Sequence, residues 1–168
     1  YKRRLRIDIK GAIYMKKISI IIPAYNEQES LPMLYERLTK LMNSMENYQF
    51  EVLFVNDGSK DKTIEIIKEL RQKDERICYV DFARNFGKEI AMIAGLDYAT
   101  GDCVVFMDAD LQDPPELIPE LVKYWEQGYD DVYAKRRSRK GETWLKKFTS
   151  KMYYRVLQHV TKVEIQED

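Results

Sequence analysis

The sequence contains a single histidine, His159, and two cysteines, Cys78 and Cys103. One histidine argues against a histidine-rich metal site and against a Ser-His-Asp triad centred elsewhere in the chain. Both cysteines fall in apolar runs typical of buried strands. We therefore expect reduced core residues and a cytosolic environment rather than a disulfide framework.

Long apolar runs and glycine-rich phosphate loops are also missing. No stretch approaches the roughly 18 apolar residues of a membrane-spanning helix, so none is expected. The sequence has neither a Gly-x-Gly-x-x-Gly turn nor a Walker-type Gly-Lys-Ser/Thr loop. This absence disfavours dinucleotide-dependent enzymes and P-loop ATPases.

What is present indicates one globular domain. The chain has 168 residues, of which 45% are hydrophobic and 33% charged, enough for a core of ordinary size. Residues 1–14 are basic and carry no clear pattern, so we interpret them as an extension. Residues 15–168 are predicted to form the domain.

Apolar strand-like runs alternate with helical patterns along most of this domain. Such alternation predicts an α/β fold, a mainly parallel sheet flanked by helices. The expected strands are residues 18–22, 50–55, 77–82, 104–107 and 131–134. The expected helices are residues 31–45, 61–70, 91–98, 115–125 and 144–160.

Two carboxylates one residue apart, Asp108 and Asp110, follow the apolar run 103–107. Such a pair is costly unless a cation binds it, and Mg²⁺ takes oxygen ligands that it often shares with substrate phosphates. The alternative is an ordinary acidic turn. Asp108 and Asp110 alone leave both interpretations open.

Two other polar loops follow apolar strands in the same way. They are residues 24–27 and 56–59, and the acidic loop spans 108–112. Ligands of parallel α/β sheets bind at the carboxyl ends of the strands, so we expect the three loops to meet at one edge of the sheet. Their convergence favours a binding site over an isolated acidic turn.

Four segments of this chain form a recognisable set of motifs. They are residues 21–27 (Ile-Ile-Pro-Ala-Tyr-Asn-Glu), 55–59 (Val-Asn-Asp-Gly-Ser) with Asp61 and Thr63, 84–88 (Arg-Asn-Phe-Gly-Lys) and 108–115 (Asp-Ala-Asp-Leu-Gln-Asp-Pro-Pro). In this order they resemble the motifs of family 2 glycosyltransferases with the Rossmann-like, nucleotide-sugar-binding GT-A fold. Within that family they resemble the polyprenyl-phosphate sugar transferases, such as dolichyl-phosphate mannose synthase and bactoprenol glucosyltransferases. The resemblance covers residues 17–162.

The resemblance implies that residues 15–168 are a catalytic domain, shortened at its C-terminal end. It implies a divalent cation, Mg²⁺ or Mn²⁺, held by Asp110 and Gln112 with Asp108 beside it. Asp57 has the alternative role of an Asx turn, and Lys88, like Arg84, could belong to a solvated charged face. The residues that would bind the donor are Pro23, Ala24, Tyr25, Glu27, Asp57, Lys88 and Asp108.

Residues 135–162 hold ten lysines or arginines and one acid, Glu142. Apolar and aromatic residues recur there at helical spacing, which is typical of a helix that lies on a membrane surface. The alternatives are a core-packed helix with a basic outer face, or nucleic-acid binding, for which no fold motif is present. Arg136, Arg137 and Arg139 are the candidates for an acceptor phosphate.

These inferences combine into one hypothesis. The hypothesis is inverting transfer of a hexose from a UDP- or GDP-linked sugar to polyprenyl phosphate. Its catalytic residues are Asp108 and Asp110, from the resemblance, and Arg136, from its position after the expected fifth strand and its capacity for bidentate binding of phosphate. The domain would be cytoplasmic, with the whole protein at the cytoplasmic face of a membrane. Three alternatives remain: a glycosyltransferase acting on a glycan hydroxyl, a nucleotidyltransferase, and a binding module without catalysis.

Overall fold

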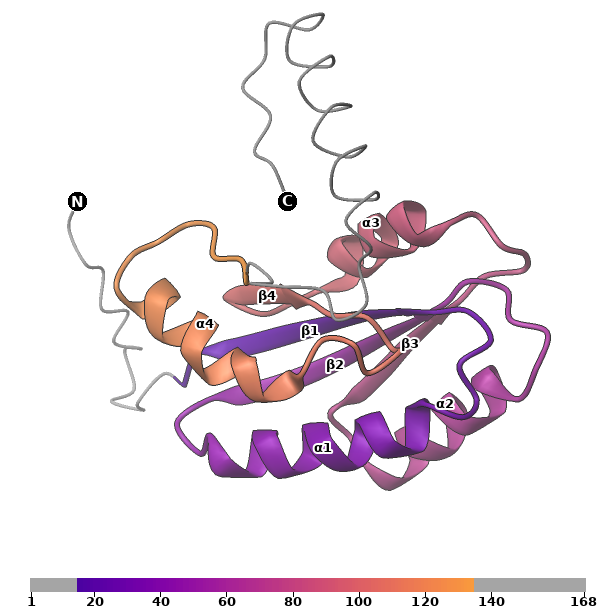
Figure 1. Ribbon diagram of the computed structural model, residues 1–168, viewed down its shortest axis with the longest axis horizontal. Helices are drawn as coiled ribbons and strands as arrows, with labels where there is room; N and C mark the ends of the chain where they lie inside the picture. Colours follow the sequence, from indigo (N-terminus) through magenta and orange to yellow (C-terminus); the bar gives the residue numbers. More distant parts are fainter. Residues whose placement is uncertain (1–14, 135–168) are drawn as a thin grey trace, which may run out of the picture. The chain divides into compact units, whose positions relative to one another are not determined.

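The computed structural model of the chain describes residues 15–134, which contain four strands and four α-helices (Figure 1). The strands are β1 (Lys17–Ala24), β2 (Gln49–Asn56), β3 (Ile77–Asp81) and β4 (Cys103–Phe106). The helices are α1 (Leu31–Ser44), α2 (Thr63–Lys73), α3 (Lys88–Tyr98) and α4 (Ile118–Glu126), the last preceded by a 3₁₀ turn, η1 (Pro115–Leu117).

The chain divides into two compact units, Tyr1–Glu120 and Leu121–Asp168. The first unit holds the sheet and α1 to α3. In the described part of the second unit, the rings of Tyr124 and Tyr129 pack edge to face, with their centroids 6.0 Å apart. No helix within residues 15–134 is long and apolar enough to cross a membrane.

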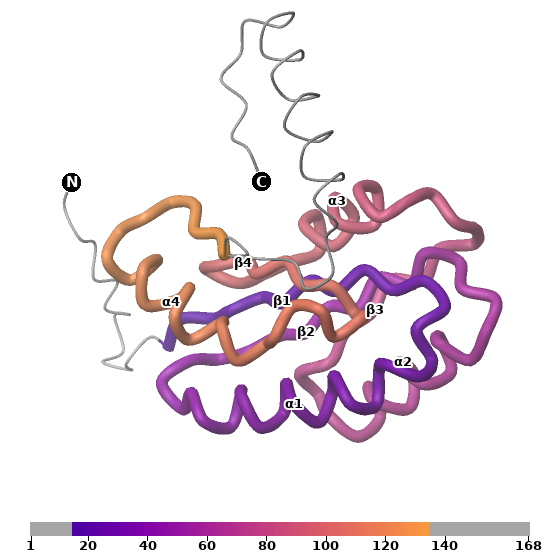
Figure 2. Tube along the Cα trace, viewed as in Figure 1, coloured from indigo at the N-terminus to yellow at the C-terminus, as the bar shows by residue number. Residues whose placement is uncertain are grey.

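All four strands are parallel, in the order β3-β2-β1-β4. The register places Ile21 of β1 beside Leu53 of β2 and Phe106 of β4. Figures 1 and 2 show α1 and α2 on one face of the sheet and α3 on the other. The chain therefore reverses its direction of winding at β1, which is where ligands bind in open α/β sheets.

Strand β1 is buried because both faces of the sheet are covered. Its isoleucines Ile18, Ile20, Ile21 and Ile22 are fully buried. A continuous apolar run, rather than an alternating one, is what a central parallel strand requires. The sequence feature that predicted this strand is thus the feature that holds it at the centre of the core.

Helix α3 lies close against the sheet through small residues. Ala91 is fully buried with Ile21 and Val55. A Cβ added to Gly95 would lie 2.3 Å from the Ile21 Cγ2 atom. No larger side chain fits there without a shift of the helix.

The α/β class and the four predicted strands at the centre of the fold are confirmed. The helix expected over residues 115–125 begins as the 3₁₀ turn η1. The predicted strand at residues 131–134 is wrong, because these residues form no strand. Val132 is half-buried, but Tyr133 is 64% exposed and Ala134 is exposed as well. The segment therefore buries too little apolar surface to hold a strand on a sheet. The helix predicted over residues 144–160 lies outside the described residues.

A buried carboxylate joins the amino-terminal ends of β1 and β2. Glu51 accepts hydrogen bonds from the Ser19 hydroxyl (2.5 Å), the Thr100 N–H (2.7 Å), the Thr100 hydroxyl (2.9 Å) and the Lys17 ammonium (2.9 Å). Burial by itself raises the pKa of Glu51. The hydrogen bonds from Ser19, Thr100 and Lys17 outweigh burial and lower this pKa to about 2.

We expect Glu51→Gln to lower the free energy of unfolding at pH 7 by about 3 kcal/mol, because the amide leaves its donors without a carboxylate. The low pKa of Glu51 stabilises the fold in full above the ordinary pKa of 4.5, and this stabilisation is lost progressively as the pH falls from 4.5 to about 2. Urea unfolding from pH 7 to pH 2 should therefore show the variant and the parent converging in acid.

Glu36→Gln is the matched control, since Glu36 forms only an exposed pair with Lys40 on one helix face. It should leave the free energy of unfolding nearly unchanged. Equal effects of the two substitutions would contradict the assignment of Glu51.

Candidate functional site

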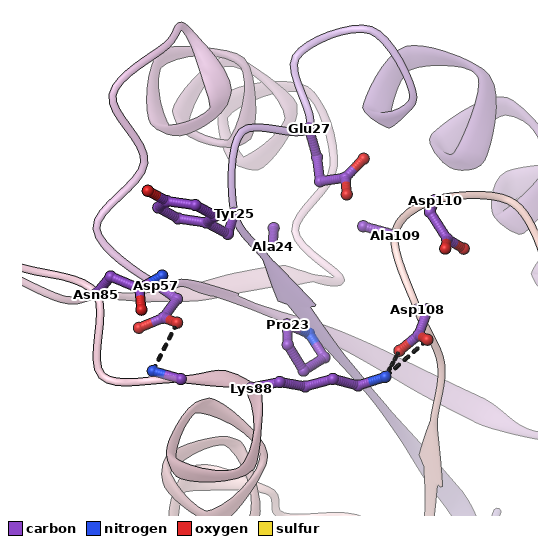
Figure 3. A pocket seen from close by; sticks show the side chains of 11 residues that line it. Pro23, Ala24, Tyr25, Glu27, Asp57, Asn85, Lys88, Asp108, Ala109 and Asp110 are labelled. Carbon is purple, nitrogen blue, oxygen red and sulfur yellow. Dashed lines mark hydrogen bonds and ion pairs between the residues drawn. The ribbon is translucent and has the colours of Figure 1, made fainter.

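A pocket of about 460 Å³ opens at the carboxyl ends of β1, β2 and β4 (Figure 3). Its volume is within the usual range for small-molecule sites. Figure 3 shows that Glu27, Asp57 and the pair Asp108 and Asp110 come from three different loops of the first unit. The lining residues are Pro23, Ala24, Tyr25, Glu27, Asp57, Asn85, Gly87, Lys88, Asp108, Ala109 and Asp110.

Every residue that the sequence assigned to donor binding lines this pocket, and so does Asp110. Gln112, the other predicted metal ligand, is exposed and is not among the lining residues. Arg136, Arg137 and Arg139 lie outside the described residues. The structure thus brings together the loops after β1, β2 and β4, while the roles of their residues stay predictions.

Sequence reasoning did not assign Asn85, Gly87 and Ala109 to the site, yet all three line the pocket. Asn85 and Gly87 belong to the loop between β3 and α3. The sequence pointed to this loop only through the family motif at residues 84–88; the strand-exit rule that found the other loops applies to β3 as well and indicates the same loop.

Asp57 is 3% exposed and holds the β3–α3 loop in place. Its Oδ1 accepts the Phe86 N–H (2.7 Å) and its Oδ2 accepts the Gly87 N–H (3.0 Å). Asp57 does not make the Asx-type bond that its alternative role requires. The Ser59 N–H donates instead to the Oδ1 atom of Asn56 (3.3 Å). Each Asp57 oxygen keeps a second lone pair, so the carboxylate can also accept a hydrogen bond from a ligand.

Gly58 lets the β2 exit loop approach this same segment. Its φ is +67°, and a Cβ added there would lie 2.3 Å from the Arg84 carbonyl carbon. Glycine tolerates both the left-handed backbone and the contact. The two loops therefore touch backbone to backbone beside Asp57.

A second set of hydrogen bonds joins the β1 exit loop to the β2 exit loop. The Asn26 N–H donates to the Ser59 hydroxyl (3.0 Å), and the Lys60 N–H donates to the Asn26 side-chain oxygen (2.8 Å). The Glu27 N–H donates to the Thr63 hydroxyl (2.8 Å). Asn26 has a φ of 57°, a conformation that asparagine accepts more readily than most residues. The first two predicted loops thus form one hydrogen-bonded unit.

Asp61 and Glu27 make further hydrogen bonds within and between the β1 and β2 exit loops. Burial raises the pKa of Asp61, but hydrogen bonds from Thr63 and Gln28 lower it more, so this pKa lies below its usual value. The Ser30 hydroxyl donates to the Glu27 Oε2 (2.6 Å). This bond holds the Glu27 carboxylate, which projects into the pocket in Figure 3.

Lys88, the first residue of α3, forms an ion pair with Asp108. Its Nζ lies 2.5 Å from Asp108 Oδ1 and 2.7 Å from Oδ2. Figure 3 shows the lysine side chain extended below Pro23 toward Asp108. Arg84, the other basic residue of this segment, lies over the Phe86 ring at 4.4 Å from its centroid and does not line the pocket.

Asp110 closes a tight turn at the end of the acidic loop. Its Oδ1 accepts the Gln112 N–H (2.9 Å), and Leu111 between them has a φ of 63°. In Figure 3 the Asp110 carboxylate lies on the same side of the pocket as Asp108.

Asp108 and Asp110 fit a hard divalent cation, because both offer carboxylate oxygens to the pocket as metal ligands. Within residues 15–134, no group of three or more His, Cys, Asp or Glu side chains could hold a metal ion. A Mg²⁺ or Mn²⁺ ion would therefore take its remaining ligands from a bound phosphate, from water or from an amide such as that of Gln112.

Comparison with known proteins decides the family. The family model described as glycosyl transferase family 2 matches residues 19–167. The chain belongs to this family. The resemblance found from the sequence motifs is therefore confirmed.

Two relatives illustrate the likeness. YkcC of Bacillus subtilis, an uncharacterized glycosyltransferase, is 52% identical over 151 residues, which cover 89% of this chain and 46% of YkcC. The prophage bactoprenol glucosyl transferase homolog of Escherichia coli is 41% identical over 152 residues, which cover 90% of this chain and 49% of the relative. The chain thus spans about half the length of these family members.

Solved structures agree on the fold. The mannosyltransferase PcManGT from Pyrobaculum calidifontis, solved in complex with GDP-Man and Mn²⁺, matches with a TM-score of 0.60. The match covers 86% of this chain and 39% of that protein at 22% identity. It confirms the GT-A glycosyltransferase fold.

The contact at Gly58 gives a testable prediction. We expect Gly58→Ala to lower the free energy of unfolding by about 2–5 kcal/mol, since a left-handed backbone costs roughly 1–2 kcal/mol and an overpacked contact roughly 1–3 kcal/mol. Hydrogen exchange at the Phe86 and Gly87 amides should also become faster, because Asp57 can no longer hold both.

Gly128→Ala is the matched control. Gly128 has a φ of +98°, and a Cβ added there would meet nothing within 4 Å. Gly128→Ala should lower the free energy of unfolding only by the cost of the positive φ. It should leave hydrogen exchange at the amides of residues 86 and 87 unchanged. The contact would be refuted if both variants lost the same stability with no change in exchange.

Proposed function

We propose that this chain carries the donor site of an enzyme that transfers a hexose from a nucleotide diphosphate sugar to polyprenyl phosphate. The observation that carries the proposal is the gathering of Glu27, Asp57, Asp108 and Asp110 in one pocket at the carboxyl ends of parallel strands. The names of several relatives as bactoprenol glucosyl transferases support the choice of acceptor.

The nucleoside would lie at the end of the pocket formed by the β1 and β2 exit loops. Tyr25 is 42% exposed there, so its ring offers a flat apolar surface to a base. Asp57 and Glu27 supply carboxylate oxygens that can accept hydrogen bonds from ribose hydroxyls or from base N–H groups. Backbone hydrogen bonds hold both loops, so the donor would meet a site that is already formed.

The diphosphate would lie near Asp108, Asp110 and Lys88. When bound, Mg²⁺ or Mn²⁺ held by the two aspartates would neutralise the charge that develops on the leaving diphosphate. Lys88 offers three N–H donors on a flexible stem to the same phosphate oxygens. The backbone N–H of Gln112 donates to the Oδ1 atom of Asp110, which leaves the Oδ2 atom for the cation.

The acceptor needs no strong base. A phosphate monoester has a second pKa of about 6, so at pH 7 it already carries most of its negative charge. One of its oxygens attacks the anomeric carbon as the bond from that carbon to the diphosphate oxygen breaks. The nucleoside diphosphate leaves with the bonding electrons, and attack from the opposite side inverts the anomeric centre.

Arg136, Arg137 and Arg139 complete the proposal on the acceptor side, with Arg136 as the candidate for bidentate binding of the phosphate. The basic residues of segment 135–162 would favour an anionic membrane surface, which is where a polyprenyl phosphate resides. This part rests on the sequence, and the membrane association of the whole protein is proposed with it.

Asp110→Asn tests the donor site. We expect it to weaken binding of UDP or GDP in the presence of Mn²⁺ at least about tenfold, since one charged contact to the cation is lost. Calorimetric titration measures this affinity. Asp97→Asn, on the exposed surface of α3 outside the pocket, is the control and should bind as the parent does. Unchanged nucleotide affinity in Asp110→Asn would overturn the metal assignment.

The acceptor is tested by incubating protein that contains this chain with UDP- and GDP-sugars and undecaprenyl phosphate in vesicles. We expect a lipid-linked sugar and free nucleoside diphosphate, with a rate that falls below about pH 6 as the acceptor phosphate gains a proton. Sugar found only on glycan hydroxyls would favour the alternative acceptor. Release of pyrophosphate would indicate a nucleotidyltransferase.

A further inference from the structure

Lys88 occupies the oxygens that a divalent cation would need. The pocket has four carboxylate side chains, and Lys88 is the only basic residue among the described residues that line it. Its ammonium contacts both oxygens of Asp108, at 2.5 and 2.7 Å. The chain thus supplies its own cation to the residue predicted to lie beside the metal.

The ion pair is placed so that it can open. The side chain of Lys88 is 53% exposed and that of Asp108 is 34% exposed, and exposed pairs contribute little to stability. The backbone under Lys88 is fixed, because Asp57 binds the N–H groups of Phe86 and Gly87 directly before it. The ammonium can therefore swing on its four-carbon stem while its Cα stays in place.

We propose that Lys88 is an exchangeable counter-ion of Asp108. It would neutralise Asp108 when no divalent cation is bound, yield Asp108 to such a cation, and move its ammonium to the diphosphate of the bound nucleotide. This inference rests on the proposed function, since it needs a cation and a diphosphate in the same pocket. It makes Lys88 a nucleotide-binding residue that also couples binding of the cation to binding of the nucleotide.

Removing the charge of Lys88 should change cation affinity and nucleotide affinity in opposite directions. Without nucleotide, Lys88 competes with the cation for the same oxygens, so removing its charge should strengthen cation binding. With nucleotide, Lys88 adds a charged hydrogen bond to the diphosphate, so removing it should weaken nucleotide binding. A lysine with a purely structural role would change neither affinity in this pattern.

The experiment titrates Mn²⁺ alone, and then UDP or GDP in saturating Mn²⁺, into the 168-residue chain by calorimetry. For Lys88→Met we expect Mn²⁺ affinity to rise about three- to fivefold, the effect of an exposed ion pair. We expect nucleotide affinity to fall about tenfold, the effect of one charged hydrogen bond. Lys88→Gln should behave in the same way, which guards against an effect of packing at the methionine.

Lys40→Met is the matched control. Lys40 forms an exposed pair with Glu36 on α1, which does not line the pocket, and both affinities should equal those of the parent. Equal Mn²⁺ affinity in Lys88→Met and the parent would overturn the exchange. Tighter Mn²⁺ with unchanged nucleotide affinity would overturn the transfer to the diphosphate. If the parent bound neither nucleotide in Mn²⁺, the donor site of the proposed function would fall, and the role of Lys88 with it.

Discussion

The pocket depends on one buried carboxylate, that of Asp57, and on the two backbone N–H groups that it binds. The donors belong to Phe86 and Gly87, which lie 29 and 30 residues further along the chain. A buried carboxylate that lost these partners would be costly, so the β3–α3 loop is drawn to the end of β2. This contact sets the start of α3, and with it the position of Lys88 beside Asp108.

The order of the strands explains why the acidic loops meet. With β1 between β2 and β4, the carboxyl ends of three strands open into the same pocket. Hydrogen bonds from Asn26 and Glu27 tie the first loop to the second, and Asp57 ties the second to the loop before α3. The opposite end of the sheet is held by Glu51, a separate network far along the strands from the site. The carboxylates that line the pocket and the carboxylate of Glu51 thus lie at opposite ends of the sheet.

The isoleucine-rich β1 was predictable from sequence because a strand buried on both faces needs a continuous apolar run. The loops after β1, β2 and β4 were predictable because strand exits gather polar residues. The bonds of Asp57 were not, since they go to backbone N–H groups, which every residue but proline offers. The failed strand at 131–134 shows the limit of short apolar patterns: on its own face Val132 has only Asp130 and the small Ala134 as neighbours, too little apolar surface to specify strand pairing.

Gly95 has a consequence for the pocket although it does not line it. Seven residues of rigid helix, about 10 Å, separate it from Lys88. At Gly95 the helix rests on Ile21 with no space for one further carbon atom. A side chain added at residue 95 would push α3 away from the sheet and move Lys88 away from Asp108. A substitution at Gly95 would therefore alter ligand binding although no residue that lines the pocket is replaced.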